Sequence, residues 1–276
     1  MGRGKGALKQ ATFGKTNCDH HSPEGAHKAQ FKSDSNQRFR IRSLRNVESH
    51  MNILVFDVNE TLLNLSPLDA AFAQVFDDPG ARQEWFNLLL QRAFTATLTN
   101  DYRDFSELGR SALHMIASKR NVHLDEAKTG ELLGIIRHLP PHPEVADALE
   151  ALYDAGFALT ALTQSPAATL EAQMNNSGLS RFFTRLFSVD AVKRYKPDPA
   201  PYRMVATEMH CNTSDMRLIA AHAWDVEGAM RVGCEAAFVA RPGQVLDPSV
   251  AAPGIVGTNL RAVAREILAT ANAIEQ

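Results

Sequence analysis

Cysteine and long apolar runs are both scarce in this sequence of 276 residues. The three cysteines, Cys18, Cys211 and Cys234, lack metal-ligand spacing, and an odd number cannot form a complete disulfide framework. No apolar run approaches the ~20 residues that a membrane-spanning helix needs. The N-terminus also lacks the apolar stretch of a secretory signal. These absences predict a cytoplasmic protein with no disulfides and no membrane contact.

A strong charge of either sign is also missing. The formal net charge is -2 and the sequence pI is about 6.6, so the chain lacks the basic surface charge that a nucleic-acid partner would need. Its hydrophobic content of 45% is ordinary for a chain that buries a core. The composition therefore favours a globular enzyme that acts on small molecules.

Residues 1–50 are rich in polar and basic residues and have almost no aliphatic ones. Such a segment cannot repay the entropy of ordering, so we expect either a disordered basic extension or a translation start that has been placed too far upstream of Met51.

The character of the chain changes at Met51. Short apolar runs at residues 53–56, 157–163, 186–189, 218–221 and 236–239 alternate with helical stretches. This alternation predicts an α/β fold with a Rossmann-like, doubly wound parallel sheet. One of the helices is expected at Pro143 to Gly156, with Val145, Leu149 and Leu152 on its apolar face.

Residues 64–139 have helical periodicity and are far too long for a strand-to-helix connection, which usually takes about 2 to 6 residues. We expect them to form an inserted helical cap over a core made of residues 51–63 and 140–276. Such a cap can cover the active site and exclude water.

Four polar residues follow predicted strands: Asp57, Thr163, Lys196 and Asp225. An open α/β sheet binds ligands at the carboxyl ends of its strands, where the strand order reverses. The four side chains are therefore expected to converge there.

Four segments in the expected order carry a family resemblance. Phe56–Leu62 resembles the first motif of the haloacid dehalogenase superfamily, in which the leading aspartate, here Asp57, attacks the substrate. Leu162–Ser165 resembles the second motif, Tyr195–Asp198 the third, and Ala220–Asp225 the fourth. Any one of these motifs is weak evidence, but four in order at strand ends are specific.

A carboxylate nucleophile displaces a leaving group and forms an ester, which water then cleaves, so two lower barriers replace one. Asp57 must stay ionised in a partly dehydrated pocket, and the cation of Lys196 would favour that form. The hydroxyls of Thr61 and Thr163 could hold the carboxylate in line.

The residue at position 59, an asparagine, distinguishes between the phosphatases and the dehalogenases of the superfamily. Phosphatases of the superfamily resemble one another in having a second aspartate at this position as a general acid, and an amide has no suitable proton to donate. Those enzymes also hold Mg²⁺ through paired carboxylates, whereas the fourth motif here offers Asp225 with His222. Because halide leaves without a proton, carbon–halogen cleavage needs neither the acid nor the metal, so no cofactor is expected.

The resemblance is nearest to the type II, or L-2-haloacid, dehalogenases, and it implies roles for particular residues. Lys196 would neutralise Asp57 and the substrate carboxylate, Asp225 would orient Lys196 or the hydrolytic water, and Tyr202 would position this network. The implied substrate-binding residues are Asn59, Thr163, Gln164, Tyr202, Phe86 and Trp224.

The sequence departs from the subfamily at three positions. Its members place a halide-binding arginine just after a tryptophan, but here Trp85 is followed by Phe86, so Arg82 or Arg92 would have to reach the halide. His222 stands where asparagine is usual, and its imidazole could activate the ester-cleaving water. Gln164 keeps an amide where asparagine is usual.

The sequence therefore predicts hydrolytic dehalogenation of small (S)-2-haloacids to 2-hydroxy acids through an ester on Asp57. Two alternatives stay open: a phosphatase or phosphonatase-like hydrolase of the same superfamily, and a catalytically idle binding protein of the same fold. A homodimer is compatible with the resemblance, and the residues do not indicate one.

Overall fold

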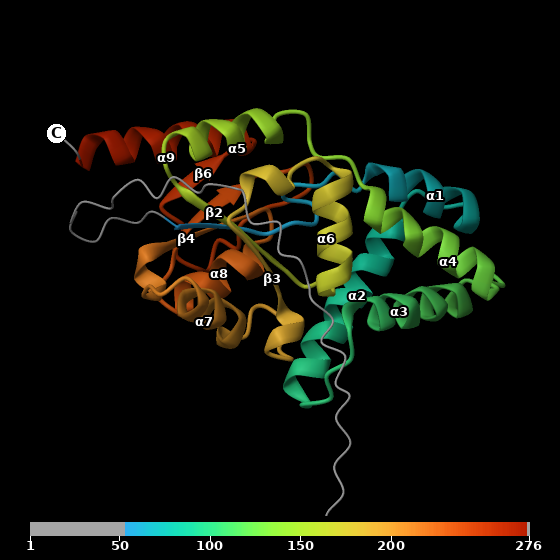
Figure 1. Cartoon of the computed structure of the whole chain (residues 1–276). Helices are drawn as coiled ribbons and strands as arrows, with labels where there is room; N and C mark the ends of the chain where they lie inside the picture. Colours follow the sequence, from blue (N-terminus) through green and yellow to red (C-terminus); the bar gives the residue numbers. More distant parts are fainter. Residues whose placement is uncertain (1–52, 275–276) are drawn as a thin grey trace, which may run out of the picture. The chain divides into compact units, whose positions relative to one another are not determined.

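The computed structural model describes residues 53–274, and the expectations for residues 1–50 lie outside this range. Six parallel strands form one sheet in the order β3-β2-β1-β4-β5-β6 (Figure 1). The strands are β1 (Ile53–Phe56), β2 (Ala158–Thr163), β3 (Arg185–Ser188), β4 (Met216–Ala220), β5 (Glu235–Val239) and β6 (Ile255–Gly257). This confirms the predicted doubly wound sheet, whose strand order reverses between β1 and β4.

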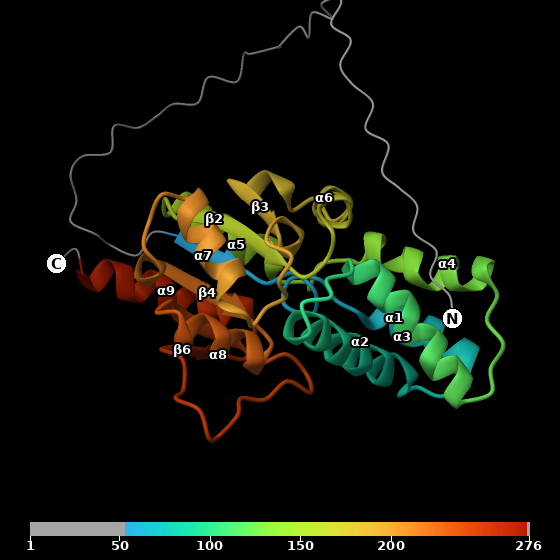
Figure 2. The same cartoon turned by 90° about the horizontal axis from the view of Figure 1, so that it is seen from below.

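The central strands are buried on both faces because helices cover the sheet on both sides. Figures 1 and 2 show α5 and α9 on one face and α7 and α8 on the other. From Val145 onward the helices are α5 (Val145–Asp154), α6 (Ala167–Asn176), α7 (Pro199–Glu208), α8 (Ala223–Arg231) and α9 (Leu260–Ile274), with short 3₁₀ turns η2 (Ser180–Phe182), η3 (Val189–Ala191) and η4 (Thr213–Asp215). A strand whose residues are all apolar is removed from water only when helices cover both faces of the sheet.

Helix α5 follows its predicted apolar face, since Val145, Leu149 and Leu152 are fully buried. Its predicted start was wrong: the helix begins at Val145, whose N–H donates to the carbonyl of His142 in a turn that holds Pro143. Gly156 follows the helix with a φ of 90°, a left-handed conformation that glycine adopts without the steric cost of a Cβ atom.

Between β1 and β2 the chain forms the inserted helices, which stand beside the carboxyl ends of the strands (Figure 2). They are α1 (Ser66–Phe76), α2 (Ala81–Leu98), α3 (Phe105–Lys119), α4 (Glu126–Gly134) and the 3₁₀ turn η1 (Ile135–His138). Asp104 caps α3 by accepting from the N–H groups of Ser106 and Glu107. The division of the chain into core and cap domains stays a prediction, because residues 53–274 all fall in one compact unit.

Within residues 53–274, no helix is both long and apolar enough to cross a membrane.

Candidate active site

Asp57 lies directly after β1, and its backbone N–H donates to the carbonyl of Ile219 in β4 (3.0 Å). The Thr61 hydroxyl donates to Oδ2 of Asp57 (2.6 Å) and accepts from the N–H of Ala221 (2.9 Å). Thr61 therefore ties the loop after β1 to the end of β4, and Asp57 is held at the point where the strand order reverses.

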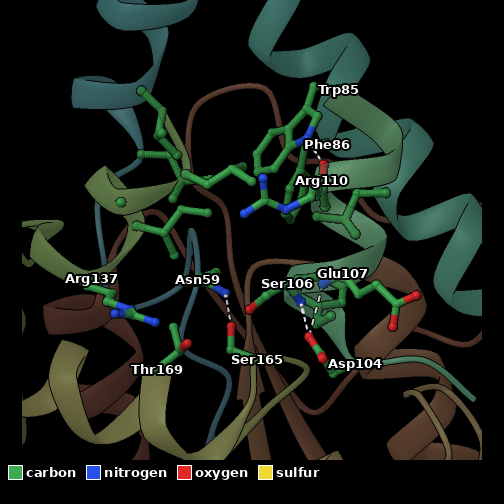
Figure 3. A pocket seen from close by; sticks show the side chains of 18 of the residues that line it. Asn59, Trp85, Phe86, Asp104, Ser106, Glu107, Arg110, Arg137, Ser165 and Thr169 are labelled. Atoms are coloured by element: carbon green, nitrogen blue, oxygen red, sulfur yellow. Dashed lines mark hydrogen bonds between the residues drawn. The ribbon is translucent and has the colours of Figure 1, made fainter. Parts of the chain in front are cut away.

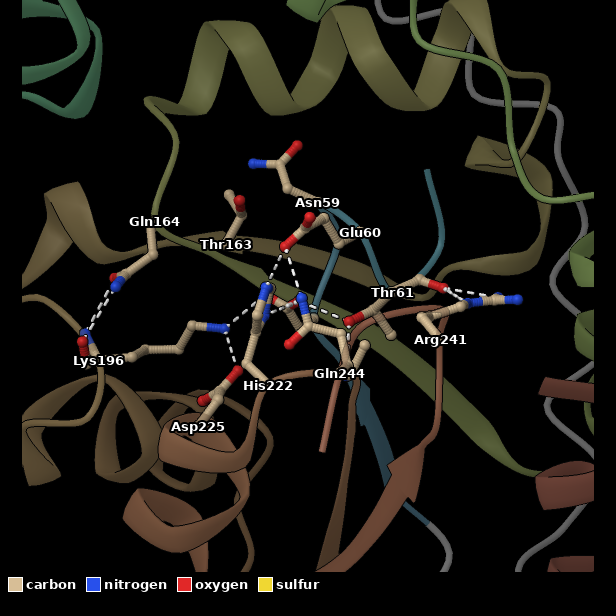
Figure 4. A network of polar contacts seen from close by, with 12 residues as sticks. Asn59, Glu60, Thr61, Thr163, Gln164, Lys196, His222, Asp225, Arg241 and Gln244 are labelled. Carbon is tan, nitrogen blue, oxygen red and sulfur yellow. Dashed lines mark hydrogen bonds and ion pairs between the residues drawn. The ribbon is translucent and has the colours of Figure 1, made fainter. Parts of the chain in front are cut away.

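Lys196 is completely buried and saturates its ammonium group with three acceptors. Its Nζ donates to Asp57 Oδ1 (2.8 Å), to Asp225 Oδ2 (2.6 Å) and to the carbonyl of Leu162 (3.0 Å) (Figure 4). Burial alone would lower the pKa of Lys196, but the two carboxylates outweigh it and raise that pKa above its usual value. The lysine is thus a fixed cation between two carboxylates.

Two opposing effects act on the pKa of the Asp57 carboxyl group. Burial by itself would raise its pKa, but the ammonium of Lys196 and the imidazole of His222 hold that pKa well below its usual range. Asp57 is therefore ionised throughout the physiological pH range, as a carboxylate nucleophile must be.

Asp225 accepts on both oxygens, from Lys196 on Oδ2 and from the Tyr202 hydroxyl on Oδ1 (2.6 Å). Burial and the nearby charge of Asp57 raise the pKa of Asp225, while Lys196 opposes this shift. The structure thus brings Asp57, Lys196, Tyr202 and Asp225 together, as the sequence predicted, although their roles remain proposals.

His222 lies between two carboxylates, and its side chain is only 5% exposed. Its Nε2 donates to Glu60 Oε2 at 2.7 Å, and its Nδ1 lies 3.2 Å from Asp57 Oδ2. The second contact lacks hydrogen-bond alignment, so Nδ1 is a buried polar atom without a hydrogen-bond partner among residues 53–274. Burial would lower the pKa of His222, but its contacts with Asp57 and Glu60 raise that pKa to about 9.

Glu60 is a site residue to which the sequence analysis gave no role. Besides His222, its carboxylate contacts Arg82 (3.1 Å) and Gln244 (3.3 Å). Its backbone is left-handed, with a φ of 63°, a conformation that costs energy for a residue with a Cβ atom. The pairing with His222 spans 162 positions, so no local pattern could have indicated it.

Arg241 is a second residue that sequence reasoning missed. Its guanidinium donates to the carbonyl oxygen of Thr61 from Nε (3.2 Å) and Nη2 (2.8 Å), and it pairs with Glu144 (2.6 Å). It thereby fixes the backbone of the loop that carries Asp57. An arginine in a loop after a strand gives no sequence signal for such a contact.

The predicted substrate-binding amides already have protein partners. Asn59 donates to the Ser165 hydroxyl (3.2 Å) and accepts from Gln173 (2.9 Å). Gln164 makes two 2.9 Å hydrogen bonds to the backbone of Lys196, one from each end of its amide. Gln164 therefore holds Lys196 in place.

Thr163 is buried beside these amides, and its hydroxyl accepts from the N–H of Ser165 (3.2 Å). The hydroxyl proton remains available for a ligand.

Two aromatic rings contact the imidazole of His222. Trp224 stacks on it with ring centroids 5.1 Å apart and an interplanar angle of 22°, and Phe86 lies 6.0 Å away. Trp85 is buried in the inserted helices and donates to the carbonyl of Gly109 (2.9 Å). We call Asp57, Glu60, Lys196, His222 and Asp225 the polar cluster. Phe86 and Trp224 thus form an apolar wall around it.

The arginines considered for the halide do not reach Asp57. Arg82 donates to Asp69 (2.7 Å) and pairs with Glu60 (3.1 Å). Arg92 forms no ion pair within residues 53–274, and its Nε is buried without a partner. The cations in contact with Asp57 are instead Lys196 and His222.

A cavity of about 450 Å³ lies between the inserted helices and the sheet end (Figure 3). Its volume is that of a small-molecule site. Asn59 and Ser165 line it on the core side, and Phe86 lines it from α2, so the cavity borders the polar cluster. Its remaining wall combines apolar side chains, namely Leu65, Leu68, Trp85, Leu89, Phe105, Leu133 and Ile136, with four charged ones, namely Asp104, Glu107, Arg110 and Arg137.

Among residues 53–274, no three histidine, cysteine, aspartate or glutamate side chains are arranged to hold a metal ion. Asp225, the carboxylate of the fourth motif, is already bound to Lys196 and Tyr202. The donor set does not suit Mg²⁺, which needs an octahedral shell of oxygens.

Residues 54–239 match the family model described as haloacid dehalogenase-like hydrolase. The chain belongs to this family. The assignment agrees with the resemblance inferred from the four motifs, and it accounts for most of the described sheet.

Several relatives of this hydrolase are named as dehalogenases. The chain is 30% identical to (S)-2-haloacid dehalogenase 4A of Burkholderia cepacia over 196 residues, which cover 68% of this chain and 83% of that protein. It is 28% identical to the (S)-2-haloacid dehalogenase of Pseudomonas sp. strain YL over 214 residues, covering 76% and 91%. The L-2-haloacid dehalogenase structure from Xanthobacter autotrophicus has the same fold, with a TM-score of 0.74, 23% identity, and coverage of 79% and 98%.

Proposed function

We propose that this hydrolase cleaves the carbon–halogen bond of small (S)-2-haloacids and releases 2-hydroxy acids. The observation that carries the proposal is the environment of Asp57, an ionised carboxylate held by Lys196 and Thr61 with an amide, Asn59, two positions further on. An alkoxide leaving group needs a general acid there, and halide does not. The names of the relatives support the same chemistry.

The first step is an in-line displacement at C2 of the acid. An oxygen of Asp57 forms a bond to C2 while the carbon–halogen bond breaks, and halide leaves with the electron pair. Water then attacks the carboxyl carbon of the resulting ester, and the ester bond breaks to give the 2-hydroxy acid with inverted configuration. The proton from water accompanies the halide into solution.

The remaining site residues would prepare these steps. The hydroxyl of Thr163 would bind the substrate carboxylate, and the positive charge of Lys196 would offset the negative charges of that carboxylate and of Asp57, with Asp225 and Tyr202 fixing the ammonium group. The rings of Phe86 and Trp224 would surround the halogen, a weakly hydrated group suited to an apolar wall, and the neighbouring cavity would take the alkyl group.

Halide release from (S)- and (R)-2-chloropropionate tests the proposal. Only the S enantiomer is expected to react, giving (R)-lactate, and Asp57→Asn should abolish release. Single-turnover reaction in ¹⁸O water should place the label in Asp57. If none of the short 2-haloacids releases halide, the proposal fails.

The same assays separate the two alternatives. Chelation by EDTA should leave halide release unchanged, whereas turnover of phosphoesters that needs added Mg²⁺ would indicate a phosphatase. Binding of a small acid in the cleft without turnover or labelling of Asp57 would indicate an idle binding protein.

A further inference from the structure

Glu60, His222 and Asp57 form a chain of contacts that the proposed function leaves partly unexplained. Nucleophilic attack needs only Asp57 with its cation Lys196, but hydrolysis of the ester needs a base for the attacking water. His222 Nδ1 is buried, has no hydrogen-bond partner, and lies 3.2 Å from an oxygen of the group to be hydrolysed. It is therefore in place to meet that water.

Glu60 determines which nitrogen of His222 can act. A carboxylate only accepts hydrogen bonds, so the 2.7 Å contact requires a proton on Nε2. When the ring is neutral, its lone pair must then be on Nδ1, which faces Asp57. The stacked ring of Trp224 and the buried position keep the imidazole in this orientation.

We propose, on the basis of the dehalogenation proposed above, that Glu60 and His222 form a catalytic dyad that alkylation of Asp57 converts from a cation into a base. His222 is the catalytic residue, because it contacts the reacting group. Glu60 is a positioning residue that acts through His222.

Charge explains the conversion. In the resting site three carboxylates, Asp57, Glu60 and Asp225, face three cations, Lys196, protonated His222 and Arg82. Formation of the ester removes the negative charge of Asp57. The imidazolium then loses one of its two anionic neighbours, which lowers its pKa, and it releases the Nδ1 proton to solvent.

The proton balance of the second step follows. Neutral Nδ1 takes a proton from water as hydroxide attacks the carboxyl carbon of Asp57. The tetrahedral intermediate collapses, the 2-hydroxy acid leaves as an alkoxide, and His222 returns the proton to it. The proton of the regenerated Asp57 carboxylic acid passes to His222, which restores the ion pair. One proton is released per turnover, as hydrolysis to halide and alcohol requires.

The pH dependence of His222 protonation is determined by all the charged groups around the ring. Asp57 and Glu60 face it from the loop after β1, Arg82 reaches Glu60 from α2, and Lys196 lies on the far side of Asp57. His142 is a further titratable neighbour, because its Nε2 lies 3.0 Å from the carbonyl oxygen of Glu60; burial lowers its pKa. The remaining neighbours, Phe86, Trp224 and Gln244, are uncharged.

Quench-flow with (S)-2-bromopropionate separates the two steps. Halide is measured as the product of alkylation, lactate as the product of hydrolysis, and the ester by intact-protein mass. In His222→Gln we expect one halide released per site in a burst, accumulation of the ester, and hydrolysis slowed by about 10²-fold or more. The burst itself shows that the variant is folded.

Glu60→Gln tests the positioning role with an isosteric change. Wild-type ester hydrolysis should rise with pH as the base loses its proton. Loss of the Glu60 charge lowers the pKa of His222. The rising limb of the pH–rate profile should therefore move to lower pH, while the plateau rate of ester hydrolysis falls. His114→Gln and Glu208→Gln are matched controls at side chains that are 41% and 47% exposed, and both should behave as wild type.

Hydrolysis at the wild-type rate in His222→Gln would overturn the dyad, and so would an unmoved pH limb in Glu60→Gln. If His222→Gln shows no burst of halide, the test is the pH at which the ester hydrolysis rate rises in Glu60→Gln. A shift of this pH to a lower value supports the dyad. Failure of the wild type to release halide or form ester would instead overturn the proposed function, so the two failures are distinguishable.

Discussion

The Nζ atom of Lys196 lies 2.6 Å from Oδ2 of Asp225, and neither side chain is exposed to solvent. The same ammonium group holds Asp57 at 2.8 Å. One cation thus neutralises two buried carboxylates that would otherwise repel each other across a dry site. Removing one partner of such a cluster leaves buried charge without compensation, which costs far more than loss of a surface ion pair.

Replacement of Lys196 by methionine should therefore reduce both stability and activity. We expect Lys196→Met to lose about 3 to 5 kcal/mol in urea unfolding, because buried Asp225 is left without a cation and Asp57 keeps only His222. Halide release should fall by about 10³-fold or more. Adding Asp225→Asn should recover part of the stability and none of the activity. Lys119→Met, at an exposed ion pair, should cost less than about 1 kcal/mol. Equal losses at the two lysines would contradict this account.

The packing of α8 depends on the absence of a side chain at Gly228. A Cβ atom there would lie 2.5 Å from Cβ of Pro197 and 2.8 Å from the Tyr202 hydroxyl. Gly228→Ala should move α8 away from α7, weaken the hydrogen bond of Tyr202 to Asp225, and cost about 1 to 3 kcal/mol. Thermal unfolding and halide release measure both effects. Gly130→Ala in α4, which meets no atom within 4 Å, should be neutral or stabilising.

The raised pKa of His222 makes stability depend on pH. The folded-state pKa of about 9 exceeds the ordinary value of 6.5, so the stabilisation is complete below pH 6.5 and is lost as pH rises through 9. The expected loss over this interval is of the order of 3 kcal/mol. Urea unfolding at a series of pH values should show it in the wild type and not in His222→Gln. Parallel curves for the two proteins would exclude His222 as the titrating group.

The cavity beside Asn59 has more room than a three-carbon acid fills. We expect the wild type to release halide from (S)-2-bromohexanoate as well as from (S)-2-bromopropionate. Gly134 lines the cavity, and a Cβ atom there meets nothing within 4 Å, so a larger side chain can project into the space.

The variant Gly134→Leu should therefore raise KM for the six-carbon acid by about 10-fold, since lost methylene contacts are worth roughly that factor each. Turnover of the three-carbon acid should stay within about twofold, and Gly134→Ala serves as the control for the backbone change. An equal effect on the two acids would show that the alkyl group lies elsewhere.

Much of the fold and of the site could be predicted from local features of the sequence. Continuous apolar runs indicate buried strands, so β1, β2 and β4 were found within two residues of their ends. Asp57 directly follows β1, Lys196 lies in the loop after β3, and Asp225 lies in the first turn of the helix after β4. Because the carboxyl ends of parallel strands meet at one edge of the sheet, these three side chains come together. Strand β6 was missed because three residues, one of them the exposed Val256, make no recognisable pattern.

By itself the sequence determined the fold class, a doubly wound parallel sheet, together with the candidate nucleophile Asp57 and the lysine beside it, because these predictions depend on patterns only a few residues long. Only the tertiary structure decided the partners of His222 and Arg82. Both contact Glu60, and that contact depends on how the loop after β1, the end of β4 and helix α2 pack around Asp57. Hydrogen bonds and ion pairs act over a few ångströms, so pairs far apart in the chain form only where packing brings the groups together.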